Sequence, residues 1–402
     1  MSSTVTETLA THVALISGQP DIEYHPDSAK YRARTASRLA SDPSLLATPL
    51  PEGFPAKLEG PIIWEGRDWT QENHWIYRLT NVEITEIDEA LAYFKALSKP
   101  LGYISSETFP LPTLGTPLKA IAKELYHGKG FSVVRGIPVD KYSREDLAIV
   151  YAGVSSYIGP SRGKQDKANA MLAHVKNLTV SHAAQGASGQ SAYTTEKQVF
   201  HTDAGDLVGL LVIQSAAEGG LFRMSSCGRI YNELAATRPD LIKVLSEPWP
   251  LDSFGGDPGY VMRPLLFIED GEHAVIQYSR RKFTGYGAQK RSPHIPPITE
   301  AQAEALDALH FLAEKFSLGI QGQKGDIQYI NNVGLVHARE AFRDDSEHIR
   351  HLIRLWLRDD ELAWKTPKAL QRSWSKLYSV PADDQQFPLE PEVAQKQGGV
   401  AI

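Results

Sequence analysis

The sequence predicts an α+β protein that is mainly β, with a β-sandwich or barrel flanked by helices. Two observations carry this prediction. Beyond residue 165, short β-rich runs alternate with Gly, Ser and Pro, which is the pattern of a sandwich or barrel. Before that point, and once after it, apolar residues recur at helical spacing. A chain of 402 residues is long enough for one large domain or two ordinary ones.

Composition and charge disfavour several classes of function. The formal net charge is −6 and no basic tract is present, so we expect no nucleic-acid partner. No apolar run reaches the length of a membrane span, and the N-terminus resembles neither a secretory signal nor a mitochondrial presequence. The single cysteine, Cys227, fits a reducing compartment and is interpreted as a small packed residue rather than a nucleophile. We therefore expect a cytoplasmic protein.

The first elements are a long extension and a helical region. Residues 1–60 are rich in Pro, Ser and Ala without sustained periodicity, which predicts an extension that wraps a domain or is partly mobile. Trp64, Trp69 and Trp75 follow and are interpreted as packing anchors. The next segments predict helices over 84–97, over 118–127 with Gly128 as its stop, and between Ser143 as N-cap and Gly159 as stop, with a buried strand over 131–136.

The second half is expected to be mostly strands. One helix is predicted over 298–316, where Thr299 and Gln302 form a capping box. Residues 381–402 are expected to be an irregular tail. The chain contains no internal repeat, P-loop, GxGxxG or GxSxG motif. The predicted strands lie within 192–203, 209–216, 260–269, 272–279, 325–331 and 349–359.

His201 and Asp203 stand one residue apart in the apolar stretch "VFHTDAGDLVGLL". In a strand, alternate side chains share a face, so these two would lie about 7 Å apart along the chain. An imidazole and a carboxylate at that spacing can meet one cation, and burial of either group without a partner is costly. A hydrogen-bonded His–Asp pair without metal satisfies the same pattern.

His337 and Arg350 supply two further groups. His337 follows the strand over 325–331 and lies among apolar residues. Arg350 begins "RHLIRLWLRD", in which Arg350, Leu352, Arg354, Trp356 and Arg358 share one face. That face suits either solvent or the inside of a ligand-holding barrel, where arginine grips a carboxylate through two parallel hydrogen bonds.

The combination is more specific than its parts. Two histidines and one carboxylate are the facial triad of non-haem Fe(II) oxygenases, which leaves positions for a chelating 2-oxo acid and dioxygen. His201, Asp203 and His337 provide that set, and Arg350 provides a partner for the far carboxylate of the oxo acid.

At these residues the sequence resembles the TauD/TfdA family of Fe(II)- and 2-oxoglutarate-dependent dioxygenases, particularly fungal members. The resemblance covers roughly residues 120–360 and includes "GFSVVRGIPVDKYSREDLAIVYAGVSSYIGP", "FHTDAGDL", "EGG" and "GDIQYINNVGLVHAREAF". It implies a double-stranded β-helix, or jelly roll, with flanking helices. It also implies that residues 61–375 form one catalytic domain between an extension (1–60) and a tail (376–402).

The resemblance implies a role for each candidate residue. His201, Asp203 and His337 would bind Fe(II), and Arg350 would bind 2-oxoglutarate. Arg354 would support the co-substrate or recognise an acidic group of the substrate, and Asn332 is a further candidate for the substrate pocket. One departure is that Phe222 stands where the family often places Thr or Ser beside 2-oxoglutarate, with Ser225 and Ser226 only later.

The implied activity is oxidation of an unactivated C–H bond of a small molecule by dioxygen, with release of succinate and CO2. The substrate is expected to carry a carboxylate, as an amino acid or secondary-metabolite precursor does. Hydroxylation, desaturation and cyclisation all stay open, as does the oligomeric state. Two other classes remain: a metal-dependent hydrolase or isomerase on a cupin-like barrel, and a non-catalytic jelly-roll binding protein.

Overall fold

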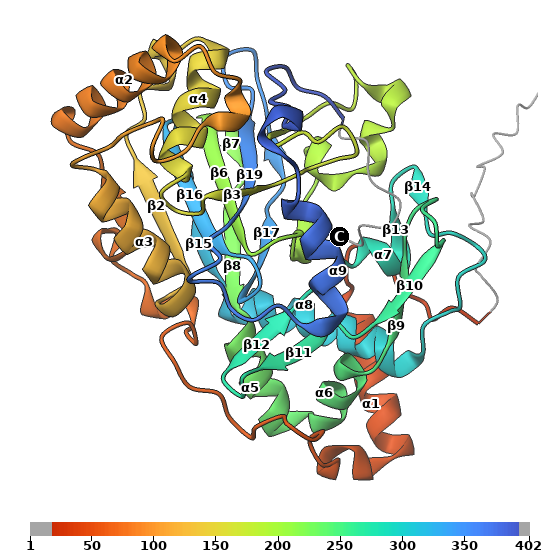
Figure 1. The fold of residues 1–402 in the computed structure, drawn as a ribbon. Coiled ribbons are helices and arrows are strands. Elements are labelled where there is room, and N and C mark those ends of the chain that lie inside the picture. The colour runs from red at the N-terminus through yellow and green to blue at the C-terminus, as the bar shows by residue number, and fades with distance from the viewer. Residues whose placement is uncertain (1–17, 394–402) are drawn as a thin grey trace, which may run out of the picture.

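A computed structural model describes residues 18–393, and two facing β-sheets form its centre (Figure 1). Helices flank the sheets on both sides. This arrangement confirms the predicted double-stranded β-helix with flanking helices.

The larger sheet is antiparallel apart from its first pair of strands. β6 (Leu207–Gln214) and β2 (Phe131–Arg135) are largely buried, because their apolar side chains lie beneath helices on one face of the sheet and toward the smaller sheet on the other. The strand predictions over 131–136, 209–216, 325–331 and 349–359 are confirmed here. In order across the sheet, the strands are β1 (Ile76–Arg78), β2 (Phe131–Arg135), β16 (Asp326–Asn331), β6 (Leu207–Gln214), β19 (His351–Arg358) and β3 (Ser161–Gly163), with β4 (Ala173–Lys176) also paired to β19.

The smaller sheet brings together strands that are far apart in the sequence. Its two inner strands are β8 (Phe222–Ser226) and β17 (Leu335–Arg339). β17 places His337 directly opposite His201 of β5 (Gln198–His201). The strand order is β15 (Leu318–Ile320), β8 (Phe222–Ser226), β17 (Leu335–Arg339) and β5 (Gln198–His201).

Helices α2 (Asn81–Ala96), α3 (Gly115–His127) and α4 (Arg144–Ser155) accompany the larger sheet, in the order that the sequence predicts. Gly128 caps the end of α3 and the Ser143 hydroxyl accepts a hydrogen bond at the start of α4, as expected. α4 ends at Ser155, before the predicted stop at Gly159. Trp64 and Trp75 are buried around Phe131 and Trp69 packs beside them, so the tryptophans are packing anchors.

A second hydrophobic core lies on the outer side of the smaller sheet, where α8 (Glu300–Phe316) packs with α5 (Cys227–Thr237) and α6 (Pro239–Ser246). The predicted capping box of Thr299 and Gln302 begins α8. Cys227 is fully buried, and burial raises the pKa of its thiol to about 12, consistent with a packed residue. Short hairpins and one short helix complete this half: β9 (Trp249–Asp252), β10 (Tyr260–Arg263), β11 (Leu266–Glu269), β12 (His273–Ile276), α7 (Arg281–Thr284), β13 (Gly285–Tyr286) and β14 (Gln289–Lys290).

The sequence analysis did not predict α5, α6 or α7, nor two further helices. α1 (Ser28–Ser41) lies within the segment expected to lack periodic structure, and it packs on α8. The face of α1 that packs inward carries Arg34 and Arg38 beside Tyr31, so it lacks a continuous apolar stripe. α9 (Lys368–Tyr378) precedes the tail. A two-strand pairing of β7 (Glu218–Gly219) and β18 (Phe342–Arg343) lies near the site described below.

Residues 381–393 are mostly irregular, as expected, and the rest of the predicted tail, 394–402, lies outside the described residues, as do 1–17. No helix in the described part of the chain is long and apolar enough to span a membrane.

Candidate metal and co-substrate site

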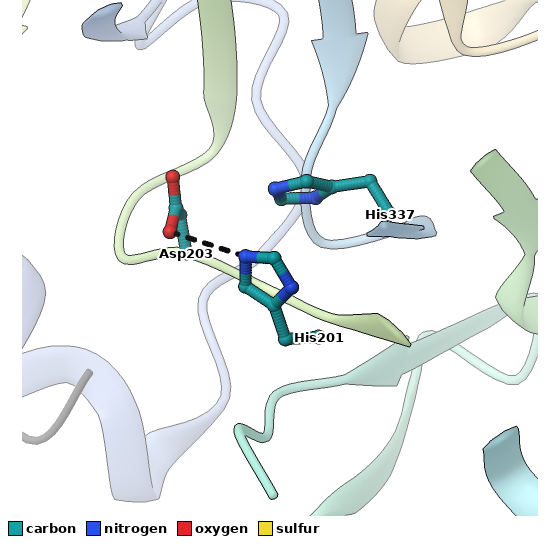
Figure 2. Close-up of side chains that lie close together, drawn as sticks. All are labelled: His201, Asp203 and His337. Atoms are coloured by element: carbon teal, nitrogen blue, oxygen red, sulfur yellow. Dashed lines mark ion pairs between the residues drawn. The ribbon is translucent and has the colours of Figure 1, made fainter. Parts of the chain in front are cut away.

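Three predicted residues meet between the sheets (Figure 2). His201 is the last residue of β5 and His337 lies in the middle of the neighbouring strand β17. Asp203 comes from the segment between β5 and β6. The predicted continuous strand through Asp203 is therefore wrong, because β5 ends at His201 and Asp203 reaches the site from a turn.

The three side chains form a compact donor set. One donor atom from each residue lies within 4.8 Å of the others. His201 Nε2 is 3.8 Å from Asp203 Oδ1, and the two imidazole rings are 4.3 Å apart between centroids. All three residues are buried. Neutral imidazole nitrogens and a carboxylate oxygen at this separation suit a divalent transition metal.

Electrostatics favour the charge state that metal binding needs. Burial lowers the pKa of His337 to about 3, with a further contribution from His201, so its imidazole is neutral near pH 7. Burial likewise lowers the pKa of His201. Burial alone would raise the pKa of Asp203, but Arg354 and the two histidines outweigh it and lower the pKa to about 2. The site thus holds two neutral imidazoles and one carboxylate.

Hydrogen bonds set the tautomer of His201 and leave one nitrogen of His337 without a partner among the described residues. His201 Nδ1 donates to Val199 O at 2.9 Å, which fixes the tautomer and leaves a lone pair on Nε2. Gln198 Nε2 lies 3.2 Å from that nitrogen. His337 Nδ1 is buried and has no hydrogen-bond partner among residues 18–393. The buried set of two imidazoles and one carboxylate is an arrangement that a bound cation completes.

Asn332 holds the turn that carries Asp203. Its side-chain oxygen accepts from Asp203 N at 2.8 Å, and its nitrogen donates to Asp203 O and Gly205 O, each at 2.8 Å. Asn332 is fully buried and its amide is occupied by these backbone groups. The structure therefore places Asn332 behind Asp203, where it positions that residue rather than facing a substrate.

Arg354 also contacts Asp203. Its Nη1 lies 2.7 Å from Asp203 Oδ2, and Trp356 Nε1 donates to the same oxygen at 3.2 Å. Both residues come from β19, so the face predicted to carry arginines and Trp356 does point inward. Asp203 Oδ1, the oxygen nearer His201, is not used by these two donors.

Arg350 lies immediately before β19 and lines a cavity that also contains all three triad residues. Its Nη1 is buried without a partner among the described residues. Burial lowers its pKa to about 9, and the nearby charge of Arg339 adds to this. The "GG" motif faces this guanidinium: Gly220 has φ +72°, and a Cβ there would lie 3.2 Å from Arg350 Nε. A buried, incompletely paired guanidinium is suited to a carboxylate.

Phe222 lines the same cavity and its ring centroid is 5.7 Å from that of His337. Ser225 is buried on β8 without a hydrogen-bond partner in the described chain and Ser226 caps α5, so neither takes the expected Thr or Ser place. Arg339, which the sequence analysis did not select, lines the cavity, and its Nε and Nη1 also lack partners in residues 18–393. Arg339 lies two residues after His337 on the same strand, so the two side chains share a face, and this spacing could have identified Arg339 as a cavity residue.

Comparison with protein families identifies this arrangement. The family model described as taurine catabolism dioxygenase TauD, TfdA family, matches residues 97–356. A taurine hydroxylase-like protein of Stachybotrys chartarum is 34% identical over 347 residues, which cover 84% of this chain and 89% of that protein. FR-33289 synthase of Streptomyces rubellomurinus is 24% identical over 311 residues, covering 74% of this chain and 89% of that protein.

Solved structures share the fold. Asparagine oxygenase in complex with Fe(II), hydroxyasparagine and succinate is 17% identical with a TM-score of 0.57, covering 76% of this chain and 98% of its own. The non-haem iron oxygenase OrfP with Fe and α-ketoglutaric acid is also 17% identical, with a TM-score of 0.54, and the match covers 76% of this chain and 98% of the OrfP chain. From the family model and the Stachybotrys relative, the chain belongs to the TauD/TfdA family of Fe(II)- and 2-oxoglutarate-dependent dioxygenases.

Proposed function

We propose that His201, Asp203 and His337 hold Fe(II), that Arg350 binds the distal carboxylate of 2-oxoglutarate, and that the enzyme oxidises a C–H bond of a small, amino-acid-like acid. One observation carries the assignment: a buried His–His–Asp donor set and an incompletely paired guanidinium line one cavity. Together with 2-oxoglutarate and O2, Fe(II) supplies the oxidising power for an unactivated C–H bond, with release of succinate and CO2.

The chain's own residues fix and shield this site. Arg354, Trp356 and Asn332 hold Asp203, so that its orientation does not depend on a regular strand. Apolar side chains on the cavity wall, including Phe222 and Leu352, limit the water around the reacting groups. In this proposal Arg354 acts mainly through Asp203, and its guanidinium also borders the substrate cavity.

The substrate class is supported by the structural neighbours. The solved complexes of asparagine oxygenase and OrfP contain hydroxylated asparagine and hydroxylated arginine, respectively. We propose a small carboxylate-bearing molecule of that kind, with hydroxylation as the reaction and desaturation or cyclisation as its variants. A cytoplasmic location is part of the proposal and is supported by the single, buried cysteine.

The test begins with anaerobic protein, Fe(II) and 2-oxoglutarate. A metal-to-ligand charge-transfer absorption band is expected for the wild type and not for His201→Ala. His351→Ala is the matched control, because His351 pairs with His174 at 2.8 Å outside the triad and should keep the band. Equal spectra for wild type and His201→Ala would contradict the assignment.

A second stage tests the reaction. Small acids and amino acids are screened for O2-dependent release of succinate, and an oxidised product is sought by mass spectrometry. Product formation without succinate or O2 would instead indicate a hydrolase or isomerase. A protein whose melting temperature does not respond to Fe(II) would indicate a non-catalytic binding protein.

A further inference from the structure

Two adjacent buried cations line the cavity that opens onto the metal site. Arg281 and Lys282 belong to the short helix α7, and both border the cavity whose lining also includes His201 and Asp203. Each is less than a tenth exposed, at 7% and 6%. They lie outside the stretches that identify the family site and have no role in the metal or 2-oxoglutarate assignment above.

Neither cation has a carboxylate partner in the described part of the chain. Arg281 Nη1 donates to Gly189 O at 3.0 Å, and Lys282 Nζ donates to Asp252 O at 2.8 Å, so both contacts are to neutral carbonyls. The Asp252 carboxylate is fully buried nearby but is occupied by Phe254 N and by the backbone and hydroxyl of Ser292.

The cavity itself does not compensate this charge. Among its lining residues, the one carboxylate is Asp203, which already pairs with Arg354. The two positive charges of Arg281 and Lys282 outweigh the nearby Asp252 carboxylate, which leaves a surplus of positive charge at a wall lined mainly by polar side chains. Burial of unpaired charge is costly, and such an arrangement is maintained where a ligand completes it.

Phe254 covers both cations. Its ring centroid lies 4.6 Å from the Arg281 guanidinium carbon and 5.1 Å from Lys282 Nζ. Phe254 has φ +47°, a left-handed conformation that costs free energy for a residue with a bulky side chain. The segment between β9 and β10 thus holds an aromatic face over the cations, which stabilises their charge without neutralising it.

We propose that Arg281 and Lys282 form an anion subsite for the substrate, so that the enzyme selects a small organic acid by its carboxylate, sulfonate or phosphonate group. The anionic group binds between the two cations under Phe254, and the carbon chain extends along the cavity toward His201 and Asp203. This inference rests on the proposed function, because it assigns the substrate end of the same site. Arg281 acts as a bidentate donor and Lys282 as a point charge.

The experiment is a calorimetric titration of protein loaded with 2-oxoglutarate and Mn(II), which replaces Fe(II) without turnover. The probes are butanoate, propane-1-sulfonate and propane-1-phosphonate, with butanamide as the neutral analogue. At least one anion is expected to bind and butanamide is not. The rank of the three anions identifies the acidic group that the subsite prefers.

Two variants test the residues. Arg281→Gln and Lys282→Met are each expected to weaken anion binding at least about tenfold, because a charged hydrogen-bond partner is lost. Lys282→Arg keeps the charge and is expected to retain most of the affinity. Arg291→Gln is the matched control, since Arg291 is another buried arginine, bonded to Ile295 O and Pro296 O outside the cavity.

Unchanged affinity in both charge-removing variants, absence of binding by all three anions, or equal binding of butanamide would overturn the proposal. The Fe(II)–2-oxoglutarate absorption band should persist in Arg281→Gln and Lys282→Met. If that band is absent even in the wild type, the metal assignment fails, whereas titration of metal-free protein with the same probes and variants still tests the anion subsite.

Discussion

Asp203 is held by groups from three parts of the chain. The Asn332 side chain binds both N and O of Asp203, and Arg354 and Trp356 bind its Oδ2. The turn that carries Asp203 continues directly from β5. Because the carboxylate oxygen nearest His201 is left free by these contacts, the turn is organised for a ligand at that position. A residue outside the donor set, such as Asn332, is therefore expected to govern metal affinity.

Asn332→Ala tests this positioning role. The change removes the hydrogen bonds of Asn332 to Asp203 N, Asp203 O and Gly205 O, of which Asp203 O keeps a second donor in Gln277 Nε2. We therefore expect weaker Mn(II) or Fe(II) binding and a loss of about 1–3 kcal/mol of stability. Metal dissociation constants and urea denaturation measure the two effects. Asn331→Ala is the control, because Asn331 is equally buried but bonds to Leu125 O and to the backbone of residues 333 and 334. If both variants lose metal affinity equally, the role of Asn332 is merely structural.

The anion subsite predicts a pH dependence. The pKa of Lys282 is lowered to about 7, mainly by burial. The positive charges of Arg281 and Arg263 lower this pKa further, and the Asp252 carboxylate raises it. Above pH 7 the free lysine is therefore neutral, and an anion must bind together with a proton. The affinity for propane-1-sulfonate should fall by up to about tenfold per pH unit above 7.

Titrations at pH 6 to 9 check this, and a Lys282→Arg variant should show no decline near pH 7. An affinity of the wild type that does not change over this range would contradict the prediction.

The sequence identified the metal and co-substrate candidates because chemically distinctive residues occurred in one order. It did not reveal Arg281 and Lys282, since an arginine next to a lysine usually lies on a solvated surface. Arg281 and Lys282 become candidates for ligand binding because they are buried and lack a hydrogen-bonded carboxylate among the described residues. Both properties depend on tertiary structure. The same holds for Asn332, whose position after a strand first indicates a turn.

At the scale of elements, α1 is attached by ion pairs and by one aromatic contact, the stacking of Tyr31 on Phe311. Arg34 Nη1 lies 2.8 Å from Asp307, Arg38 pairs with Glu304, and no residue of α1 is buried. The segment preceding α1 contacts the region around α7: Arg280 Nε donates to Glu23 O at 2.6 Å, and Tyr24 packs on Tyr286. The N-terminal segment therefore supports the helix that carries Arg281 and Lys282.

The double variant Arg34→Gln/Arg38→Gln tests this support. Each lost partner of a buried carboxylate is expected to cost about 1–3 kcal/mol, moderated here because Arg280 and Arg238 remain beside Asp307 and Glu304. We expect faster tryptic cleavage within α1 and weaker binding of the probe anions, with the Fe(II)–2-oxoglutarate band unchanged. Lys30→Gln, which removes exposed pairs with Asp21 and Glu23, should leave both measurements as in wild type. Anion affinity that survives release of α1 would contradict the proposed support.

Elements with a strong local signal were predicted well. α8 combines a capping box with an apolar stripe, and both are visible in the sequence. α1 lacks the stripe, so its docking could not be read from periodicity. α9 is different, because its buried Leu370, Trp374 and Leu377 do recur at helical spacing, and the tail boundary proposed at residue 376 falls inside it.

At the scale of the whole molecule, the candidate metal site lies between two hydrophobic cores. Phe200 of β5 packs in the core under α8, whereas the neighbouring His201 faces the cavity between the sheets. His337 on β17 follows the same division, with Val336 and Ala338 in that core. A metal held by these residues would therefore join the smaller sheet to the turn that enters the larger one.

Metal binding should stabilise the whole fold. At a free Mn(II) concentration 100 times the dissociation constant, the free energy of unfolding is expected to rise by about 2.7 kcal/mol, because the unfolded chain lacks the assembled site. Urea denaturation with Mn(II) and with a chelator measures the difference. His337→Ala should show no such difference, and a comparable Mn(II) effect in that variant would mean that the metal binds elsewhere.

The placement of Arg281 and Lys282 has an evolutionary consequence. The proposed iron and 2-oxoglutarate residues sit on or beside strands of the two sheets, whereas the proposed anion subsite is built by α7 and the β9–β10 connection, outside both sheets. Mutations in these peripheral segments could change which acid is accepted while the oxidative machinery is inherited intact. Paralogues could thus acquire different substrate specificities through changes in one loop, whereas a substitution in the triad would abolish activity on every substrate.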